Sequence, residues 1–138
     1  MGPNVVNLAE RRKSKPVKPT VLELATFVCD DILDHWNKAS SKNKLNEYFM
    51  VCTPPYSHAG INYLEDLTAI AEMERRIGLW VQIISPNFGE PGIPGWVAAF
   101  RVGSTTVATP FFISETFVRC FNILLYLRLQ RDLKSFDV

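Results

Sequence analysis

The apolar positions of residues 20–36 repeat with the period of an α-helix. Thr20 and Glu23 have the T-x-x-E spacing of a capping box, in which each side chain accepts a hydrogen bond from a backbone N–H at the helix start. We therefore predict a helix that begins after Thr20. Its apolar side carries Val21, Leu24, Ala25, Val28, Ile32 and Trp36.

The next apolar segment follows a polar loop, NKASSKNK, and reads EYFMVC at residues 47–52. Six residues are too few to predict a helix, and their composition is typical of a short strand. A turn then leads into a second predicted helix, which begins at Ser57 or Gly60 and ends before Gly78, a helix stop. Its apolar side carries Ile61, Leu64, Leu67, Ile70, Ala71 and Ile77.

Three further segments predict strands. Residues 79–85 and 96–102 are rich in β-branched and aromatic residues, and residues 103–109 read as a turn followed by a third short strand. A strand that is apolar on both faces lies in a sheet that is covered on both faces. In the first strand, one face carries Leu79, Val81 and Ile83, and the other carries Trp80 and Ile84.

The last predicted helix runs from Thr109 to about Leu133. Thr109 suits the N-cap, and Pro110 suits the first helical position, where its missing N–H costs nothing. This helix is apolar around much of its circumference, which indicates a buried helix or an oligomer interface. Together the elements predict an α+β fold: a three-layer α/β/α sandwich of three helices and a small, mainly antiparallel sheet, because the connections are too short for crossovers.

Composition divides the chain into an arm and a domain. The 138 residues are 47% hydrophobic, enough for one domain with a core, and the formal charge is +1. Residues 1–20 hold five cations against one acid, which leaves ten cations and thirteen acids for the rest. We expect residues 1–19 to be a disordered basic arm and residues 20–138 to be a single domain. The arm serves either as a solubilising tail or as a contact for nucleic-acid phosphate or an acidic partner, and we do not favour nucleic acid.

The sequence predicts neither a membrane-spanning segment nor disulfide bonds. The most apolar stretch, FNILLYLRL, is broken by Asn122 and Arg128 and is shorter than a membrane span. There is no apolar signal-peptide core near the N-terminus. The three cysteines are an odd number without a CxxC pair, which suits a reducing cytoplasm.

The sequence contains no clear catalytic or metal-binding pattern, and we therefore predict that the protein is not an enzyme. The two histidines, His35 and His58, lie in different elements, and no Cys or His spacing fits zinc. Cys52 and His58 could imitate a nucleophile and its base, but their spacing alone is not evidence. The glycines of GEPGIPG lack the strand-to-helix context of a phosphate-binding loop. We therefore predict no catalytic residues, no cofactor and no metal.

Candidate binding residues are aromatic and cationic. Arg119 lies among apolar neighbours, where it must reach solvent, pair with a carboxylate or meet an anionic ligand. The connector 85–95 holds three prolines and three glycines, and it is either a plain connector or a rigid lip that presents Asn87 and Phe88 beside Arg101. Phe88 and Tyr56 are the two predicted aromatic walls of the site. The predicted ligand-binding residues are Arg119, Arg101, Phe88, Asn87 and Tyr56.

Four motifs occur in an order that resembles the phage ABA-sandwich domain family. They are PPYSHAGINYLEDLTAIAE, LWVQI, GWVAAFRV and ATPFFISETFVRCFNILL. With the first helix, the resemblance covers roughly residues 20–133. The features shared with the family are the Tyr56-Ser57 helix entry, Gly95-Trp96 with Ala98 and Phe100, the Thr109-Pro110 start and the Arg119-Cys120 pair.

The resemblance implies an α/β/α sandwich from a bacteriophage or prophage, working in the cytoplasm of the infected bacterium. Phage proteins that look similar in size and layering are anti-defence sponges that sequester a cyclic ADP-ribose-type signal between subunits of an oligomer. The implied function is a non-enzymatic binding protein for a small nucleotide, acting as a homo-oligomer without membrane contact. Two alternatives stay open: a protein-interaction module that inhibits or recruits a host factor, and a DNA-associated accessory protein.

Overall fold

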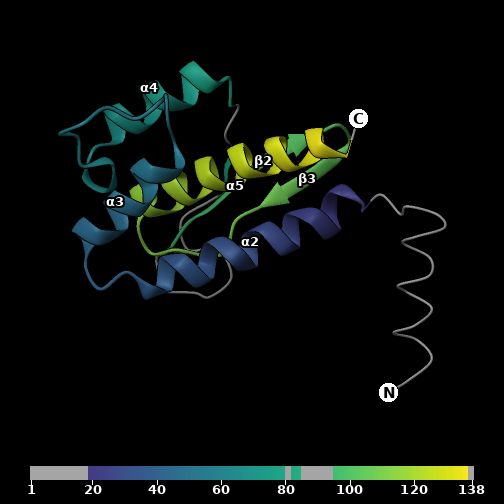
Figure 1. Ribbon diagram of the computed structural model, residues 1–138, viewed down its shortest axis with the longest axis horizontal. Coiled ribbons are helices and arrows are strands. Elements are labelled where there is room, and N and C mark those ends of the chain that lie inside the picture. The colour runs from purple at the N-terminus through teal and green to yellow at the C-terminus, as the bar shows by residue number, and fades with distance from the viewer. Residues whose placement is uncertain (1–18, 80–81, 85–94, 137–138) are drawn as a thin grey trace.

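The computed structural model describes residues 19–79, 82–84 and 95–136 (Figure 1). The predicted basic arm and most of the predicted connector, with Asn87 and Phe88, lie outside these described residues. The elements are α2 (Val21–Lys38), α3 (Lys42–Cys52), η1 (Tyr63–Glu65), α4 (Leu67–Ile77), β1 (Gln82–Ile84), β2 (Val97–Val102), β3 (Thr105–Ala108) and α5 (Glu115–Ser135).

Helix α2 confirms the predicted capping box. The Thr20 backbone N–H donates to Glu23 Oε1 at 2.9 Å, and the Glu23 N–H donates to Thr20 Oγ1 at 3.1 Å. The predicted apolar side faces the core, where five of its six residues are buried. A local signal of two side chains therefore fixes where this helix begins.

A loop does follow the first helix, at residues 39–41, but helix α3 replaces the rest of the predicted loop and the predicted strand at residues 47–52. The helix begins after Ser41, whose Oγ accepts from the Lys44 N–H at 3.2 Å. Leu45 and Phe49, four residues apart, are the buried residues of α3, so the apolar period is helical. The strand prediction was wrong because the EYFMVC window excluded Leu45 and with it the start of the repeat.

Two predicted helix starts also need correction. Helix α4 begins at Leu67 with Asp66 as its N-cap, and the 3₁₀ turn η1 precedes it; Gly78 ends it in the left-handed conformation, as predicted. Helix α5 begins at Glu115 with Ser114 as its N-cap. Thr109 is not a cap, because its Oγ1 accepts from the Ala98 N–H at 3.1 Å and extends the pairing of β3 with β2.

The sheet is antiparallel in the order β1-β2-β3, which confirms the predicted sheet type. Phe100 of β2 lies opposite Val107 of β3, and a turn containing Gly103 with φ +61° joins the two strands. After β3 the chain pairs once more with the start of β2, through two hydrogen bonds between Trp96 and Phe112 of 2.6 and 2.9 Å.

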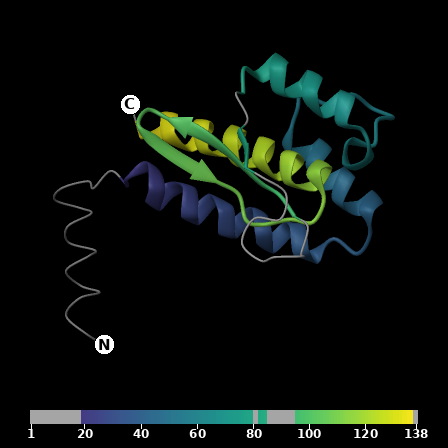
Figure 2. The same cartoon turned by 180° about the vertical axis from the view of Figure 1, so that it is seen from behind.

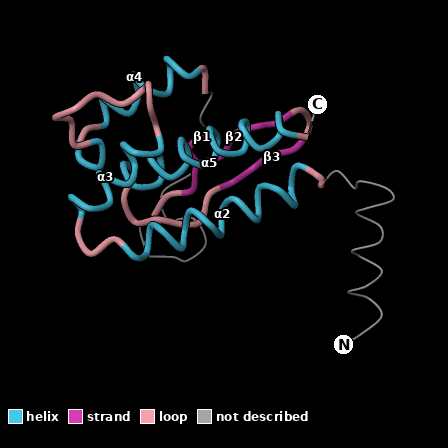
Figure 3. Tube along the Cα trace, viewed as in Figure 1, coloured by secondary structure: helices cyan, strands magenta, loops and turns pink. Residues whose placement is uncertain are grey.

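Helices and strands form two layers in the described part of the chain. Helices α2 and α5 lie side by side and run in opposite directions (Figures 1 and 3). Viewed from behind, the strands lie in front of α5 (Figure 2). Helix α5 contacts β2, α2 contacts β3, and α4 packs on α5 and η1. The fold is α+β with four α-helices in the described residues, one more than predicted, and these residues do not confirm a third layer.

Helix α5 forms the centre of the core, as its apolar composition predicted. Its residues Val118 to Leu125 are almost all buried. Toward α2 it packs against Trp36, whose ring lies 5.3 Å from that of Phe121, and toward the sheet Tyr126 meets Phe100 edge-on at 5.2 Å. Among the described helices, none is long and apolar enough to cross a lipid bilayer.

Candidate ligand-binding groove

A groove lies where α2, α3 and α5 meet, beside the turn that follows α3, and we call it the α3–α5 groove. Its volume of about 440 Å³ falls within the range of small-molecule sites. Its lining consists of Ile32, Tyr48, Val51, Cys52, Pro54, Tyr56, Leu124, Leu127, Arg128 and Arg131.

The walls of the groove follow from helix periodicity. Tyr48 and Cys52 are four residues apart on α3, so they lie on the same side of that helix, and Leu124, Leu127, Arg128 and Arg131 likewise share a side of α5. Ile32 and Leu124 are buried and supply an apolar floor. The groove therefore combines an apolar floor with tyrosine and arginine side chains at its walls.

The Tyr48 phenol and the Cys52 thiol of the groove stay protonated at neutral pH. Burial raises the pKa of the Tyr48 phenol well above its ordinary value, and the adjacent Cys52 thiol raises it further. Burial also raises the pKa of Cys52. The His35 ring stacks parallel on Tyr48 with 5.5 Å between ring centroids, which supports the phenol from outside the groove. Tyr48 and Cys52 thus present neutral groups to a ligand.

A chain of alternating charges borders the groove. Arg128 Nη1 donates to Asp31 Oδ2 at 2.6 Å, and Arg128 Nε donates to Asp132 Oδ2 at 3.3 Å. Arg131 Nε donates to the other oxygen of Asp132 at 3.3 Å. The hydrogen bond from Arg128 lowers the pKa of Asp31, so this carboxylate stays charged. The chain ties α2 to α5 and ends at Arg131.

The structure separates the predicted site residues. Tyr56 lines the groove. Arg119 does not, because its Nε and Nη2 donate to the two oxygens of Glu74 and its Nη1 donates to Glu115 at 3.1 Å. Of the three arrangements considered for Arg119, the structure shows the one with carboxylate partners. Arg101 is exposed on β2 opposite Thr106, away from the groove.

Besides the apolar lining, sequence reasoning missed four polar residues that line the groove. Tyr48 and Cys52 were assigned to a strand, and a helical reading of residues 42–52 would have placed them on one side. Arg128 and Arg131 interrupt the apolar last helix three residues apart, which was the available signal for a polar edge. Tyr56, which was predicted as an aromatic wall of a binding site, is one of the lining residues.

The described residues contain no group of three or more His, Cys, Asp or Glu side chains that could hold a metal ion. His58 Nε2 accepts from Arg76 Nη1 at 2.8 Å, so one of the two ring nitrogens already has a hydrogen-bond partner. The raised pKa of Cys52 likewise opposes a thiolate at neutral pH. The groove combines enclosed space, aromatic side chains and cations, which are features of small-molecule binding sites.

In comparisons with known proteins, no family model, no curated protein and no solved structure matches this chain.

Proposed function

We propose that this chain is a non-enzymatic binding protein that holds a small organic ligand in the α3–α5 groove. The observation that carries the proposal is the groove itself, with about 440 Å³ of space between an apolar floor, two tyrosines and two arginines. Sites for small molecules are mostly apolar with a few converging polar groups, and this lining has that character. The neutral Cys52 thiol and the engaged His58 ring support a binding role over a nucleophilic one.

The resemblance to the phage ABA-sandwich domain family supports a narrower form of this proposal. In that form the protein is a bacteriophage accessory protein in the cytoplasm of the infected host, a homo-oligomer with a third layer over its sheet. Its ligand is a cyclic or ADP-ribose-type nucleotide that it sequesters as an immune signal. The aromatic walls of the groove suit a nucleobase, since phenol and base rings stack.

The proposal is tested by thermal unfolding and calorimetric titration against a panel of nucleotides and neutral aromatic fragments. We expect at least one member to raise the unfolding temperature, with no turnover of the ligand. Tyr56→Leu should weaken binding because it removes a ring from the groove wall. Phe27→Leu is the matched control, since Phe27 is an exposed aromatic on α2 that does not line the groove. If no member binds, or if both variants weaken binding equally, the proposal fails.

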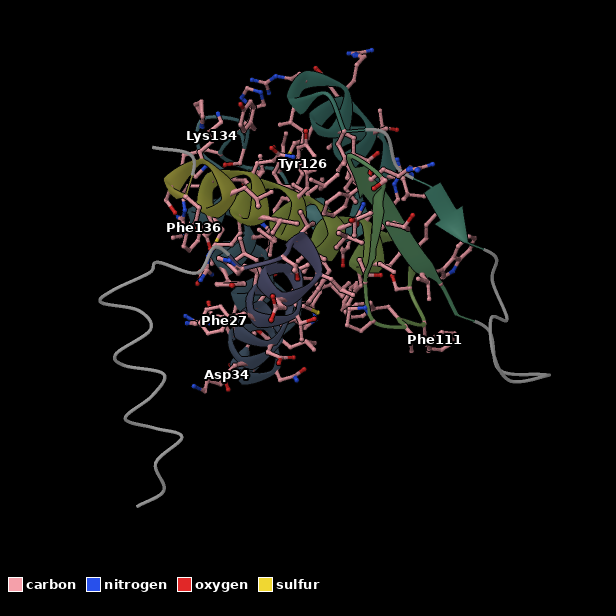
Figure 4. The ribbon with its side chains drawn as sticks, turned by 90° about the vertical axis from the view of Figure 1, so that its right-hand side faces the viewer. Phe27, Asp34, Phe111, Tyr126, Lys134 and Phe136 are labelled. Carbon is pink, nitrogen blue, oxygen red and sulfur yellow. The ribbon has the colours of Figure 1, made fainter. Side chains whose placement is uncertain are left out.

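A second candidate is the protein-interaction module, and exposed apolar side chains favour it. Leu22 and Phe27 on α2 and Phe136 after α5 are exposed, and Figure 4 shows Phe27 and Phe136 at the outer side of the helices. An interaction through this surface should be lost in Phe27→Ser and retained in Tyr56→Leu. The reverse pattern would assign the interaction to the groove.

A further inference from the structure

We infer that the ligand of the α3–α5 groove carries a carboxylate or phosphate group that binds Arg131, while its apolar body lies against the tyrosines. The inference rests on the proposed function, because it requires the groove to be the ligand site. Its grounds are the hydrogen-bond partners and the exposure of the two groove arginines.

Arg128 has a positioning role. Its guanidinium donates to Asp31 on α2 and to Asp132 on its own helix, and its side chain is 27% exposed. The pair with Asp31 anchors α5 to α2, and the pair with Asp132 within α5 helps to hold the guanidinium in place. An anion that took Arg128 from Asp31 would leave a carboxylate of the helix–helix contact without its partner, which costs free energy.

Arg131 is the cation available to a ligand. Its side chain is 72% exposed, and its only hydrogen bond to another described residue runs from Nε to Asp132 at 3.3 Å. A guanidinium has five N–H donors in a planar fork, so four remain for a ligand anion. Exposed ion pairs contribute little to stability, so exchange of Asp132 for a ligand carboxylate or phosphate costs little. Asp132 keeps Arg128 as a partner after the exchange.

The neighbouring groups do not oppose an anion at this position. Arg131 bonds to Asp132, and Asp132 and Asp31, the two carboxylates of the charge chain, are each held by Arg128. Tyr48 and Cys52, on the α3 wall, are neutral at pH 7 because burial raises the pKa of both groups. The site therefore pairs a neutral aromatic interior with a cation at its border, which fits a molecule with an apolar ring and one anionic group.

The test uses the full chain in two-dimensional amide NMR titrations with four probes: phenyl phosphate, benzoate, benzyl alcohol and inorganic phosphate. We expect phenyl phosphate or benzoate to shift the amides of Tyr48 and Leu127, and benzyl alcohol to bind about tenfold or more weakly, because charge-assisted hydrogen bonds are the stronger ones. Inorganic phosphate should bind more weakly than phenyl phosphate, since it lacks the ring. The ratio of phenyl phosphate to benzoate affinity distinguishes a phosphate ligand from a carboxylate ligand.

Two arginine variants localise the effect. Arg131→Gln should reduce the affinity for the preferred anionic probe about tenfold and leave that for benzyl alcohol unchanged. Arg101→Gln is the matched control, because Arg101 is an exposed arginine on β2 outside the groove, and it should change neither affinity. Arg131→Lys keeps the charge but loses the planar fork, so its loss should be intermediate.

The outcomes separate the inference from the proposed function. If benzyl alcohol binds in the groove as tightly as the anionic probes, or if Arg131→Gln leaves the anion preference intact, the inference is overturned and the groove remains a ligand site. If none of the four probes nor any member of the wider fragment panel shifts the groove amides, the proposed function fails as well. Loss of anion binding in Arg101→Gln would also overturn the inference.

Discussion

Arg119 and Arg131 lie on the same helix and have opposite environments. Arg119 is 17% exposed and bound to two carboxylates, one of which, on Glu74, is 7% exposed. Arg131 is mostly exposed and shares one carboxylate with a second arginine. A cation in an apolar helix therefore says nothing about ligand binding until its partners are known, and the arginine with fewer partners is the better candidate.

The largest effect should come from breaking the buried pair. Arg119→Leu leaves the Glu74 carboxylate buried without its cation, and we expect a loss of about 3 kcal/mol in the free energy of unfolding. Urea denaturation measures this loss. The double variant Arg119→Leu with Glu74→Leu should recover part of it, because well-packed apolar residues can replace a buried ion pair. An Arg119→Leu protein as stable as the parent would show that the pair is not structural.

A smaller effect of opposite sign is expected at Asn122. This side chain is fully buried in α5, and neither of its amide atoms has a hydrogen-bond partner among the described residues. Asn122→Leu keeps the branching and the number of side-chain heavy atoms and removes the unpaired polar group, so it should raise the free energy of unfolding by about 1–2 kcal/mol. Asn122→Ala, measured by the same urea denaturation, controls for volume and should not stabilise. Destabilisation by the leucine would contradict the expectation that the unpaired amide is the larger cost at this site.

The Arg128–Asp31 pair should give a still smaller, pH-dependent effect. The pKa of Asp31 is lowered from an ordinary value of 3.8, chiefly by the hydrogen bond from Arg128. The pair therefore stabilises the fold above that value, and the contribution is lost as the pH falls through the lower pKa of the folded state. Thermal unfolding from pH 7 to pH 2 should show a shallower acid loss in Asp31→Asn than in the parent. Parallel curves would exclude a contribution from this carboxylate.

The smallest effect on stability is expected at Arg131. Arg131→Gln should change the free energy of unfolding by less than about 0.5 kcal/mol, because an exposed ion pair contributes little. Its effect should appear in binding of anionic probes alone. Urea denaturation beside the Arg119→Leu protein gives the direct comparison. A loss of stability as large as that of Arg119→Leu would show that Arg131 also stabilises the fold, and the contrast between the two arginines would disappear.

Local signals predicted the elements whose ends depend on residues close in sequence. The Thr20–Glu23 capping box, the Gly78 stop and the strand around Phe100 all appear as expected. Prediction failed where a local signal competed with a tertiary contact. Thr109 has the residue type of an N-cap, but its hydroxyl bonds to the backbone of Ala98, eleven residues away, and the helix begins later.

The candidate site was less predictable than the fold. Tyr56, a predicted binding residue, lines the groove, whereas most of the other lining residues come from helices far apart in sequence. Arg128 and Asp31 are 97 residues apart, and no pattern within α2 or α5 pairs them. The misassigned helix α3 also hid the spacing of Tyr48 and Cys52, because their relation exists only in a helix.

By itself the sequence determined an α+β fold with a capped first helix, an antiparallel sheet and a buried last helix. Periodicity, caps and turns act over three or four residues, so the chain states them directly. Only the tertiary structure decided which arginine is paired and which is available. Glu74 and Arg119 meet across 45 residues because α4 packs on α5. Such packing decides which surface cation is available to a ligand, because a carboxylate a few ångströms from a guanidinium changes what that guanidinium can bind.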